Sequence, residues 1–289
     1  MLREGLVALN GFLRIDAALD DATKMLQAVS DSPRLDAELL LSRALDVSRS
    51  YLFAHPDDEM DADAARRFQN SLTQRAQGMP MAYIAGFREF WSMELIVSPA
   101  TLIPRPETET IIDQALMRLP RREERSVLDL GTGSGAISLA IARERPLCGI
   151  VATDISADAI AVARENARRL GMPNIDFLAG DWLEPVAGRM FDLVVSNPPY
   201  VASGDPHLEA LRFEPRSALE AGADGLDAIR TLAAKAMPAL KPGGAILLEH
   251  GADQAEGVAA LLAEHGWIDI TLARDLAGLP RVTAATSRS

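Results

Sequence analysis

A short segment, Asn197-Pro198-Pro199-Tyr200, brings together groups that could hold a planar amino or amide nitrogen. The asparagine side chain and the two proline-constrained carbonyls can accept hydrogen bonds, and the tyrosine adds an aromatic face. The segment follows the apolar run 191–196, which is typical of a buried parallel strand. Because two consecutive prolines cannot continue a central strand, the chain must leave the sheet at Asn197. Ligands of open α/β sheets bind at such carboxyl ends of strands.

A glycine-rich turn follows a second apolar run, residues 126–130. It consists of Gly131, Thr132, Gly133, Ser134 and Gly135. Glycines at these positions permit a positive φ and let a ligand approach the backbone closely. With Ala136 the turn also satisfies the dinucleotide-binding pattern, so it does not choose between cofactors, and a tight turn that binds nothing remains an alternative.

Two acidic residues follow the next strands. Asp154 lies 23 residues after Gly131, where a carboxylate can accept hydrogen bonds from both hydroxyls of a ribose. This suits NAD and S-adenosylmethionine equally, and Asp154 could instead cap the next helix, although Ser156 is better placed for that role. Further along, Asp181 could accept from the amine of an adenine, and Trp182 could either pack on its ring or belong to the core.

The segment Asn197–Tyr200 favours S-adenosylmethionine over NAD, because an enzyme that methylates an amide needs a rigid clamp. An amide nitrogen is a poor nucleophile, since its lone pair is delocalised into the carbonyl. If Asn197 Oδ1 and the Pro198 carbonyl each accept one N–H, they favour a pyramidal nitrogen and direct its lone pair at the methyl group. No strong base is required, because the nitrogen becomes acidic as it is alkylated. The alternative is a Pro-Pro turn that only shapes a loop.

The elements that position these residues alternate between helix and strand from Ile111 onward, which predicts an α/β fold with a parallel, doubly wound sheet. Strands are expected at 126–130, 150–153, 175–178, 191–195, 245–249, 268–272 and 281–286. Helices are expected at 111–119, 136–145, 156–170, 226–240 and 252–265, the fourth ending at Lys241-Pro242-Gly243-Gly244.

The first 77 residues are expected to be helical, with helices at 17–29, 36–45 and 61–77 and a helix start at Ser32-Pro33. Gly78-Met79-Pro80 breaks the last of them, and the aromatic and β-branched residues that follow predict a short hairpin. We therefore expect a helical domain at 1–77, a β-hairpin linker at 78–103 and the α/β domain at 104–289.

The amino-acid composition limits the kinds of ligand and partner that the protein is expected to bind. Hydrophobic residues are 48% and charged residues 24% of 289, and the net charge is −12. Residues 1–75 carry nine basic and thirteen acidic side chains, which argues against general nucleic-acid binding. Cys148 is the only cysteine and the four histidines are scattered, so no metal site is expected. With no signal peptide or membrane span in evidence, the cytoplasm is the expected compartment.

The chain resembles the protein-(glutamine-N5) methyltransferases that modify peptide chain release factors. Similarity runs over nearly its whole length. The matching segments are 88–91 (REFW), 102–109 (LIPRPETE), 129–135 (DLGTGSG), 197–200 (NPPY), 213–216 (FEPR), 224–227 (DGLD) and 248–251 (LEHG). The resemblance implies a class I S-adenosylmethionine-dependent methyltransferase domain (Rossmann-like, doubly wound), joined by a β-hairpin to a small N-terminal helical domain that recognises the substrate.

The resemblance also implies roles for residues. Asn197, Pro198, Pro199 and Tyr200 are expected to clamp the glutamine of the Gly-Gly-Gln tip of the release factor. S-adenosylmethionine is expected to contact Gly131, Thr132, Gly133, Ser134, Gly135, Asp154, Asp181, Trp182 and Asn197. Arg105 and Glu107 fall in a segment that borders the cofactor pocket. Two parts depart from the family: the final strand, 281–286, lacks a usual Gly-Arg, and the N-terminal segment matches only in pattern.

Four other functions compete with this prediction. A sister group methylates glutamine on a large-subunit ribosomal protein and shares the clamp, but the PRPETE segment at 104–109 favours the release-factor group. An N6-adenine-type nucleic-acid methyltransferase also uses such a clamp, yet would require basic recognition elements. An NAD-dependent oxidoreductase would need a hydride-transfer acid or base, which is not apparent. A non-catalytic S-adenosylmethionine-binding protein would not need the clamp.

Overall fold

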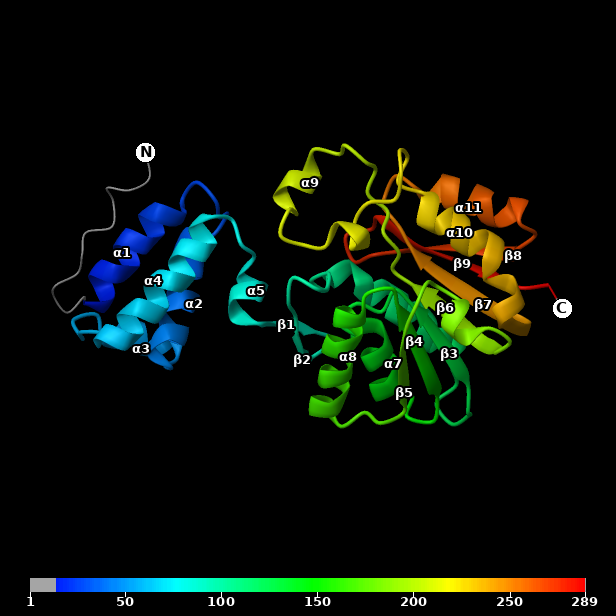
Figure 1. Ribbon diagram of the computed structural model, residues 1–289, viewed down its shortest axis with the longest axis horizontal. Helices are drawn as coiled ribbons and strands as arrows, with labels where there is room; N and C mark the ends of the chain where they lie inside the picture. The colour runs from blue at the N-terminus through cyan, green and yellow to red at the C-terminus, as the bar shows by residue number, and fades with distance from the viewer. Residues whose placement is uncertain (1–13, 289) are drawn as a thin grey trace. The chain divides into compact units, whose positions relative to one another are not determined.

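The computed structural model describes residues 14–288, and the chain divides into two compact units, Met1–Ala85 and Gly86–Ser289 (Figure 1). In the described range, no helix has the length and apolar character needed to cross a membrane. The first unit is helical, and the second contains a hairpin and a seven-stranded sheet flanked by helices.

The described part of the first unit contains five helices around one apolar core. They are α1 (Ile15–Leu26), α2 (Pro33–Leu45), α3 (Arg49–Ala54), α4 (Ala62–Ala76) and α5 (Met81–Ala85). Pro33 begins α2 as predicted, but α3 was not expected, and α5 occupies residues assigned to the hairpin. Met81 and Ile84 pack against the helical core, and this packing overrides the strand preference of the local sequence.

The hairpin opens the second unit. Strands β1 (Phe87–Phe90) and β2 (Met93–Ile96) pair antiparallel, and the two residues between them, Trp91 and Ser92, both have a positive φ, as a tight hairpin turn requires. The Ile96 backbone exchanges two hydrogen bonds with the Asn166 side chain. These contacts bind the hairpin to the α/β region of its own unit.

Seven strands form the main sheet in the order β5-β4-β3-β6-β7-β9-β8. They are β3 (Ser126–Leu130), β4 (Gly149–Asp154), β5 (Ile175–Ala179), β6 (Phe191–Ser196), β7 (Leu240–Glu249), β8 (Ile268–Arg274) and β9 (Pro280–Thr286). The first five in this order are parallel, but β9 is antiparallel to both β7 and β8. The expectation of an all-parallel sheet was therefore wrong at this edge, because the short turn between β8 and β9 permits only an antiparallel pair.

Helices cover both faces of the sheet (Figure 1). On one face the core includes side chains of α6 (Glu109–Arg118), α7 (Ala136–Glu144) and α8 (Ala157–Leu170). On the other face it includes side chains of α10 (Asp227–Lys235) and α11 (Ala255–Glu264). The remaining short elements are η1 (Pro106–Thr108), η2 (Glu184–Val186), α9 (His207–Ala210), η3 (Arg216–Ala218) and η4 (Met237–Ala239). Alternate residues of β3 point to opposite cores, as a doubly covered strand requires.

The predicted end of the helix expected at 226–240 was wrong. Helix α10 ends at Lys235 rather than at Leu240, because Pro238 has no backbone N–H and cannot continue the helix. Strand β7 then begins at Leu240 and includes the segment 241–244 that was expected to be the helix stop, with a shift in register against β6.

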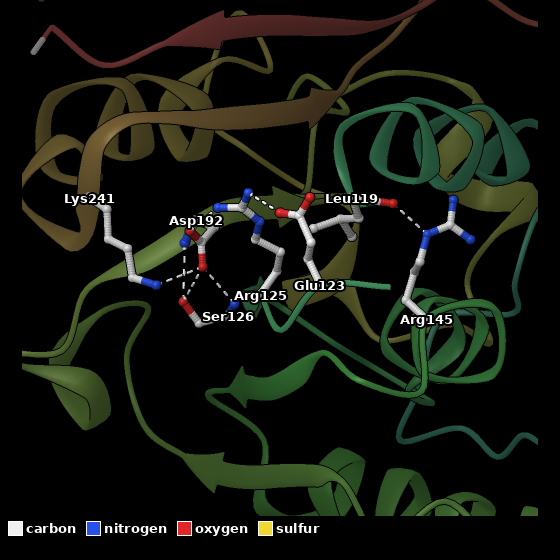
Figure 2. Close-up of polar contacts among 7 residues, drawn as sticks. All are labelled: Leu119, Glu123, Arg125, Ser126, Arg145, Asp192 and Lys241. Atoms are coloured by element: carbon white, nitrogen blue, oxygen red, sulfur yellow. Dashed lines mark hydrogen bonds and ion pairs between the residues drawn. The ribbon is translucent and has the colours of Figure 1, made fainter. Parts of the chain in front are cut away.

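A polar cluster closes the amino ends of β3, β6 and β7 (Figure 2). Asp192 Oδ2 accepts from Ser126 N at 2.7 Å, Ser126 Oγ at 2.8 Å and Lys241 Nζ at 2.7 Å. Arg125 Nη1 lies 3.3 Å from Asp192 Oδ1. Burial alone would raise the pKa of Asp192, but these donors outweigh it and hold the pKa well below the usual range. Nearby, the buried Arg145 guanidinium donates to the Leu119 carbonyl at the end of α6.

Candidate active site at the carboxyl ends of the central strands

The site lies where the order of the sheet reverses direction. From β3 the chain proceeds outward to β4 and β5, whereas β6, β7 and the strands after them lie on the other side of β3. The crevice of an open α/β sheet forms at such a switch point, outside the carboxyl ends of the strands. Here the glycine turn leaves β3 and the Asn197–Tyr200 segment leaves β6, so two motifs far apart in sequence become neighbours.

A cavity of about 240 Å³ opens at this place. Its walls include these predicted residues: Gly131, Thr132, Gly133, Ser134, Asp154, Asp181, Trp182, Asn197 and Pro199. Three predicted residues do not line it: Gly135, Pro198 and Tyr200. Gly135 precedes α7, Pro198 is buried and Tyr200 is half-buried beyond the wall. The structure thus brings together both motifs and both acidic residues.

The glycine turn has a backbone that favours glycine. Gly131 has a φ of +75°, and a Cβ there would lie 3.6 Å from Trp182 Cζ3. Gly135 has a φ of +85°, and a Cβ there would lie 3.1 Å from Leu139 Cδ1. Beneath the turn, Asp129 accepts hydrogen bonds from the hydroxyls of Thr132 at 2.7 Å and Ser138 at 2.5 Å. Burial raises the pKa of Asp129 to about 6.

Asp154 fixes the turn from the neighbouring strand. Its Oδ2 accepts from Gly133 N at 2.9 Å, and its Oδ1 accepts from Ser156 N at 2.9 Å. Ser156 is the N-cap of α8, because its hydroxyl accepts from Ala159 N at 3.1 Å. Each Asp154 oxygen keeps a second lone pair, so the carboxylate can still accept hydroxyl groups from a ligand in the cavity.

The far wall of the cavity is more apolar. Trp182 is half-exposed and has a φ of +41°, and the Thr153 hydroxyl donates to its carbonyl at 3.0 Å. Ile155 is 69% exposed and also lines the cavity. Sequence reasoning missed Ile155, although its place directly after Asp154 could have indicated it. The two side chains provide apolar surfaces suited to a flat aromatic ring, while Asp181 is exposed and polar.

Side chains from two other segments form hydrogen bonds with Asn197–Tyr200, the clamp segment. Asn197 Nδ2 donates to Thr108 Oγ1 at 3.2 Å, which leaves Asn197 Oδ1 as an acceptor. The Tyr200 carbonyl accepts from Gln254 Nε2 at 3.0 Å. Burial, followed by the nearby charge of Glu249, raises the pKa of Tyr200 to about 12, so its hydroxyl stays protonated.

Glu249, the last residue of β7, lies next to this clamp and was assigned no role from the sequence. It is 1% exposed, and within residues 14–288 neither carboxylate oxygen has a hydrogen bond of good geometry. Burial raises the pKa of Glu249 to about 7, while the Thr108 hydroxyl, the Arg281 charge and the Asn197 amide lower it. The LEHG match was the only sequence signal for this residue.

Two further segments form part of the cavity wall and are tied together by Glu214. The wall includes Thr101, Leu102, Pro104 and Thr108 from one segment and Pro215, Ser217 and Ala218 from the other. Buried Glu214 accepts from Ile103 N at 3.0 Å and pairs with Arg105. Arg105 and Glu107 themselves do not line the cavity, although their segment does.

Across residues 14–288 there is no group of three or more His, Cys, Asp and Glu side chains arranged to hold a metal ion. The polar groups around the cavity include backbone N–H groups, hydroxyls, carboxylates and one amide. Such a set suits a ligand with hydroxyl and amino groups.

Comparison with known proteins identifies the family. The profile described as PrmC N-terminal domain matches residues 17–86, and the profile described as methyltransferase small domain matches residues 112–213. The release factor glutamine methyltransferase of Xylella fastidiosa is 53% identical over 252 residues, which cover 86% of this chain and 92% of that protein. That of Escherichia coli is 45% identical over 267 residues, covering 92% and 96%.

Among solved structures, a methyltransferase from Pyrococcus furiosus superposes with a TM-score of 0.53 at 18% identity, covering 68% of this chain and 90% of that chain. This likeness, together with the methyltransferase profile, confirms the predicted class I methyltransferase fold. The family resemblance drawn from the sequence is also confirmed. The chain belongs to the release factor glutamine methyltransferase family.

Proposed function

We propose that this protein transfers a methyl group from S-adenosylmethionine to the side-chain amide nitrogen (N5) of the glutamine in the Gly-Gly-Gln motif of peptide chain release factors. One observation carries the proposal. Asn197 and Pro199 share the wall of one cavity with the glycine turn and Asp154, at the switch point of the sheet. An amide clamp and a nucleoside cradle at one place suit methyl transfer to an amide.

The polar and apolar groups that line the cavity support S-adenosylmethionine as the cofactor. The positive-φ glycines leave backbone surface free of Cβ atoms, and Asp154 has lone pairs for ribose hydroxyls. Ile155 and Trp182 provide apolar faces for the adenine, and Asp181 can accept from its amine. When bound, the cofactor supplies a methyl group on a positively charged sulfur, which leaves as a neutral thioether.

The chain's own contribution is to present the substrate nitrogen. Asn197 Oδ1 and the Pro198 carbonyl each accept one N–H of the glutamine amide, which weakens its delocalisation and directs the lone pair at the methyl carbon. The nitrogen held by the clamp would form the new bond to the methyl carbon while the electron pair of the broken carbon–sulfur bond would remain on sulfur. The alkylated nitrogen is strongly acidic, so it releases one proton to water without a dedicated base.

The choice of a protein substrate rests on family membership and charge. Close relatives carry the name release factor glutamine methyltransferase, and the net charge of −12 disfavours a nucleic-acid target. We further propose that the helical unit, Met1–Ala85, recognises the release factor, with the hairpin as its linker to the catalytic domain. A substrate of protein synthesis would place the enzyme in the cytoplasm.

The test incubates the protein with methyl-labelled S-adenosylmethionine and one candidate acceptor at a time. The acceptors are a release factor, the same release factor with the motif glutamine replaced by alanine, ribosomal protein and RNA. We expect label on the unaltered release factor only. Label that persists after the glutamine is replaced, or that goes to ribosomal protein or RNA instead, would contradict the proposal.

A further inference from the structure

Glu249 is the one buried carboxylate at the carboxyl ends of the strands, among residues 14–288, whose two oxygens both lack a well-formed hydrogen bond. Burying a carboxylate without partners is costly, so such a residue calls for an explanation. Ser196, the last residue of β6, pairs with Leu248 of β7, so Asn197 and Glu249 are the residues that follow this pair in their two chain segments. The unpartnered carboxylate therefore lies directly behind the amide clamp.

Three polar groups meet at this point from three parts of the chain. Asn197 Nδ2 donates to Thr108 Oγ1 at 3.2 Å, and Thr108 is 4% exposed in η1. The Thr108 hydroxyl and the Asn197 amide also lower the pKa of Glu249, so they act on its carboxylate although neither forms a hydrogen bond of good geometry with it. Because an ionised carboxylate only accepts hydrogen bonds, the edge of the Asn197 amide that faces it must be the NH2 edge.

We propose that Glu249 is a positioning residue of the clamp: with the Thr108 hydroxyl, it holds the Asn197 NH2 group inward so that Oδ1 faces the substrate amide. An asparagine amide can rotate by half a turn at little cost, and the reversed orientation would present a donor to the donor groups of the substrate. The Glu249 carboxylate, a fixed acceptor beside the clamp, favours only the orientation in which the Asn197 NH2 group faces it. This inference rests on the proposed function.

The charged environment of Glu249 determines when it can act. Arg281 on β9 favours its ionised form, while Glu107 on η1 disfavours it, and Tyr200 stays neutral. Burial lowers the pKa of the neighbouring His250, whose ring nitrogens are hydrogen-bonded to the Gly251 carbonyl and the Thr283 hydroxyl. Once Glu249 takes up a proton, one of its oxygens becomes a donor and can turn the Asn197 amide around.

The test compares Glu249→Gln, Thr108→Val and Thr108→Ser with the unaltered enzyme. We expect Glu249→Gln to lower kcat about 100-fold and Thr108→Val about 10-fold, with Thr108→Ser near the unaltered value. For Glu249→Gln, the KM for release factor and the calorimetric Kd for S-adenosylmethionine should stay within about threefold, because neither ligand contacts Glu249 in this account. The rise of kcat with pH near neutrality should disappear in Glu249→Gln.

One control variant, together with the unaltered enzyme, separates failure of this inference from failure of the proposed function. Asp192→Asn alters a carboxylate at the amino ends of the same strands, and its kcat should match that of the unaltered enzyme. If the unaltered enzyme methylates release factor but Glu249→Gln keeps its kcat and its pH profile, the inference is wrong. A loss that is matched by loss of S-adenosylmethionine binding would also overturn it. If the unaltered enzyme leaves release factor unmethylated, the proposed function itself fails.

Discussion

Two carboxylates sit at opposite ends of the same parallel strands and have opposite surroundings. Asp192, at the amino ends, accepts hydrogen bonds from Ser126, Lys241 and Arg125 (Figure 2), and its pKa is held well below the usual range. Glu249, at the carboxyl end of β7, has no well-formed hydrogen bond within the described residues, and burial raises its pKa to about 7. The carboxylate at the amino ends of the strands is therefore hydrogen-bonded and ionised, whereas the carboxylate at the carboxyl end lacks such partners and has a pKa near neutrality.

The difference reflects what each end does. A carboxylate with a full set of donors lowers the free energy of the folded state and closes the bottom of the sheet. A carboxylate without partners destabilises the fold, and this cost is retained where it orients a reacting group. Five single substitutions test this contrast between the two ends of the sheet.

The largest effect is expected for Asn197→Ala at the carboxyl end. Removing the amide acceptor should lower kcat by about 100-fold or more, since one preorganised hydrogen bond in a transition state is worth that much. The Kd for S-adenosylmethionine, measured by calorimetry, should change little, because the glycine turn and Asp154 remain. A collapse of cofactor binding would instead mean that Asn197 acts mainly on the cofactor or on folding.

Glu249→Gln should change how stability depends on pH. The pKa of Glu249 is about 7 in the folded state, above its unfolded value of about 4.5. Between these two pH values Glu249 keeps its proton in the folded state but loses it in the unfolded state. The native protein should therefore lose stability as pH rises from about 4.5 to about 7. Relative to it, the variant should gain about 2–3 kcal/mol in free energy of unfolding between pH 5 and pH 8, measured by urea titration. If the free energy of unfolding changed with pH in the same way in the variant and in the native protein, the raised pKa of Glu249 would be contradicted.

Asp192→Asn should show the reverse dependence. Its folded pKa is lowered, so the stabilisation is present above the unfolded pKa of about 4 and is lost as pH falls toward the folded value. We expect the variant to be less stable by about 2 kcal/mol at pH 7, with a gap that narrows in acid. Chemical denaturation measures the gap, and kcat for the folded protein should not change. A fall in kcat without loss of stability would undo the contrast between the two ends.

The smallest effect is expected for Ser126→Ala. It removes the hydroxyl that donates to Asp192 at 2.8 Å but keeps the backbone N–H donor at 2.7 Å. The cost in stability should be about 1 kcal/mol, with kcat unaltered. Thr108→Val removes the corresponding hydroxyl beside Glu249, and there the change should appear in kcat rather than in thermal stability. Equal loss of stability in both variants, with kcat unaffected, would remove the distinction.

Much of the fold could be predicted because proline and glycine mark its boundaries. Strand β3 and the strand before Asn197-Pro198 were located from apolar runs that end at residues unable to continue them. The end of α10 was missed because Pro238 was given less weight than the later Pro242-Gly243-Gly244. Helix α5 was missed because its tyrosine and isoleucine favour strands locally, and only packing in the folded unit makes them helical.

The candidate site was only partly predictable for a different reason. The glycine turn and Asn197–Tyr200 are local motifs, so their types and spacing are visible in the sequence. Thr108 reaches Asn197 across 89 residues, and Glu249 reaches the clamp only through the register of β6 with β7. The register between strands that are distant in sequence cannot be predicted from a single sequence. The residues that support the clamp are therefore found only in the three-dimensional structure. The assigned roles of the site residues stay predictions until the variants are measured.

The most direct test of the account is to locate the transferred methyl group. Release factor is incubated with the enzyme and S-adenosylmethionine carrying a deuterated methyl group, and its peptides are sequenced by mass spectrometry. We predict one labelled methyl on the side-chain nitrogen of the Gly-Gly-Gln glutamine, and almost none when Asn197→Ala replaces the enzyme. Label on any other residue, or undiminished labelling by Asn197→Ala, would contradict the claim that the carboxyl ends of these strands form an amide-methylating site.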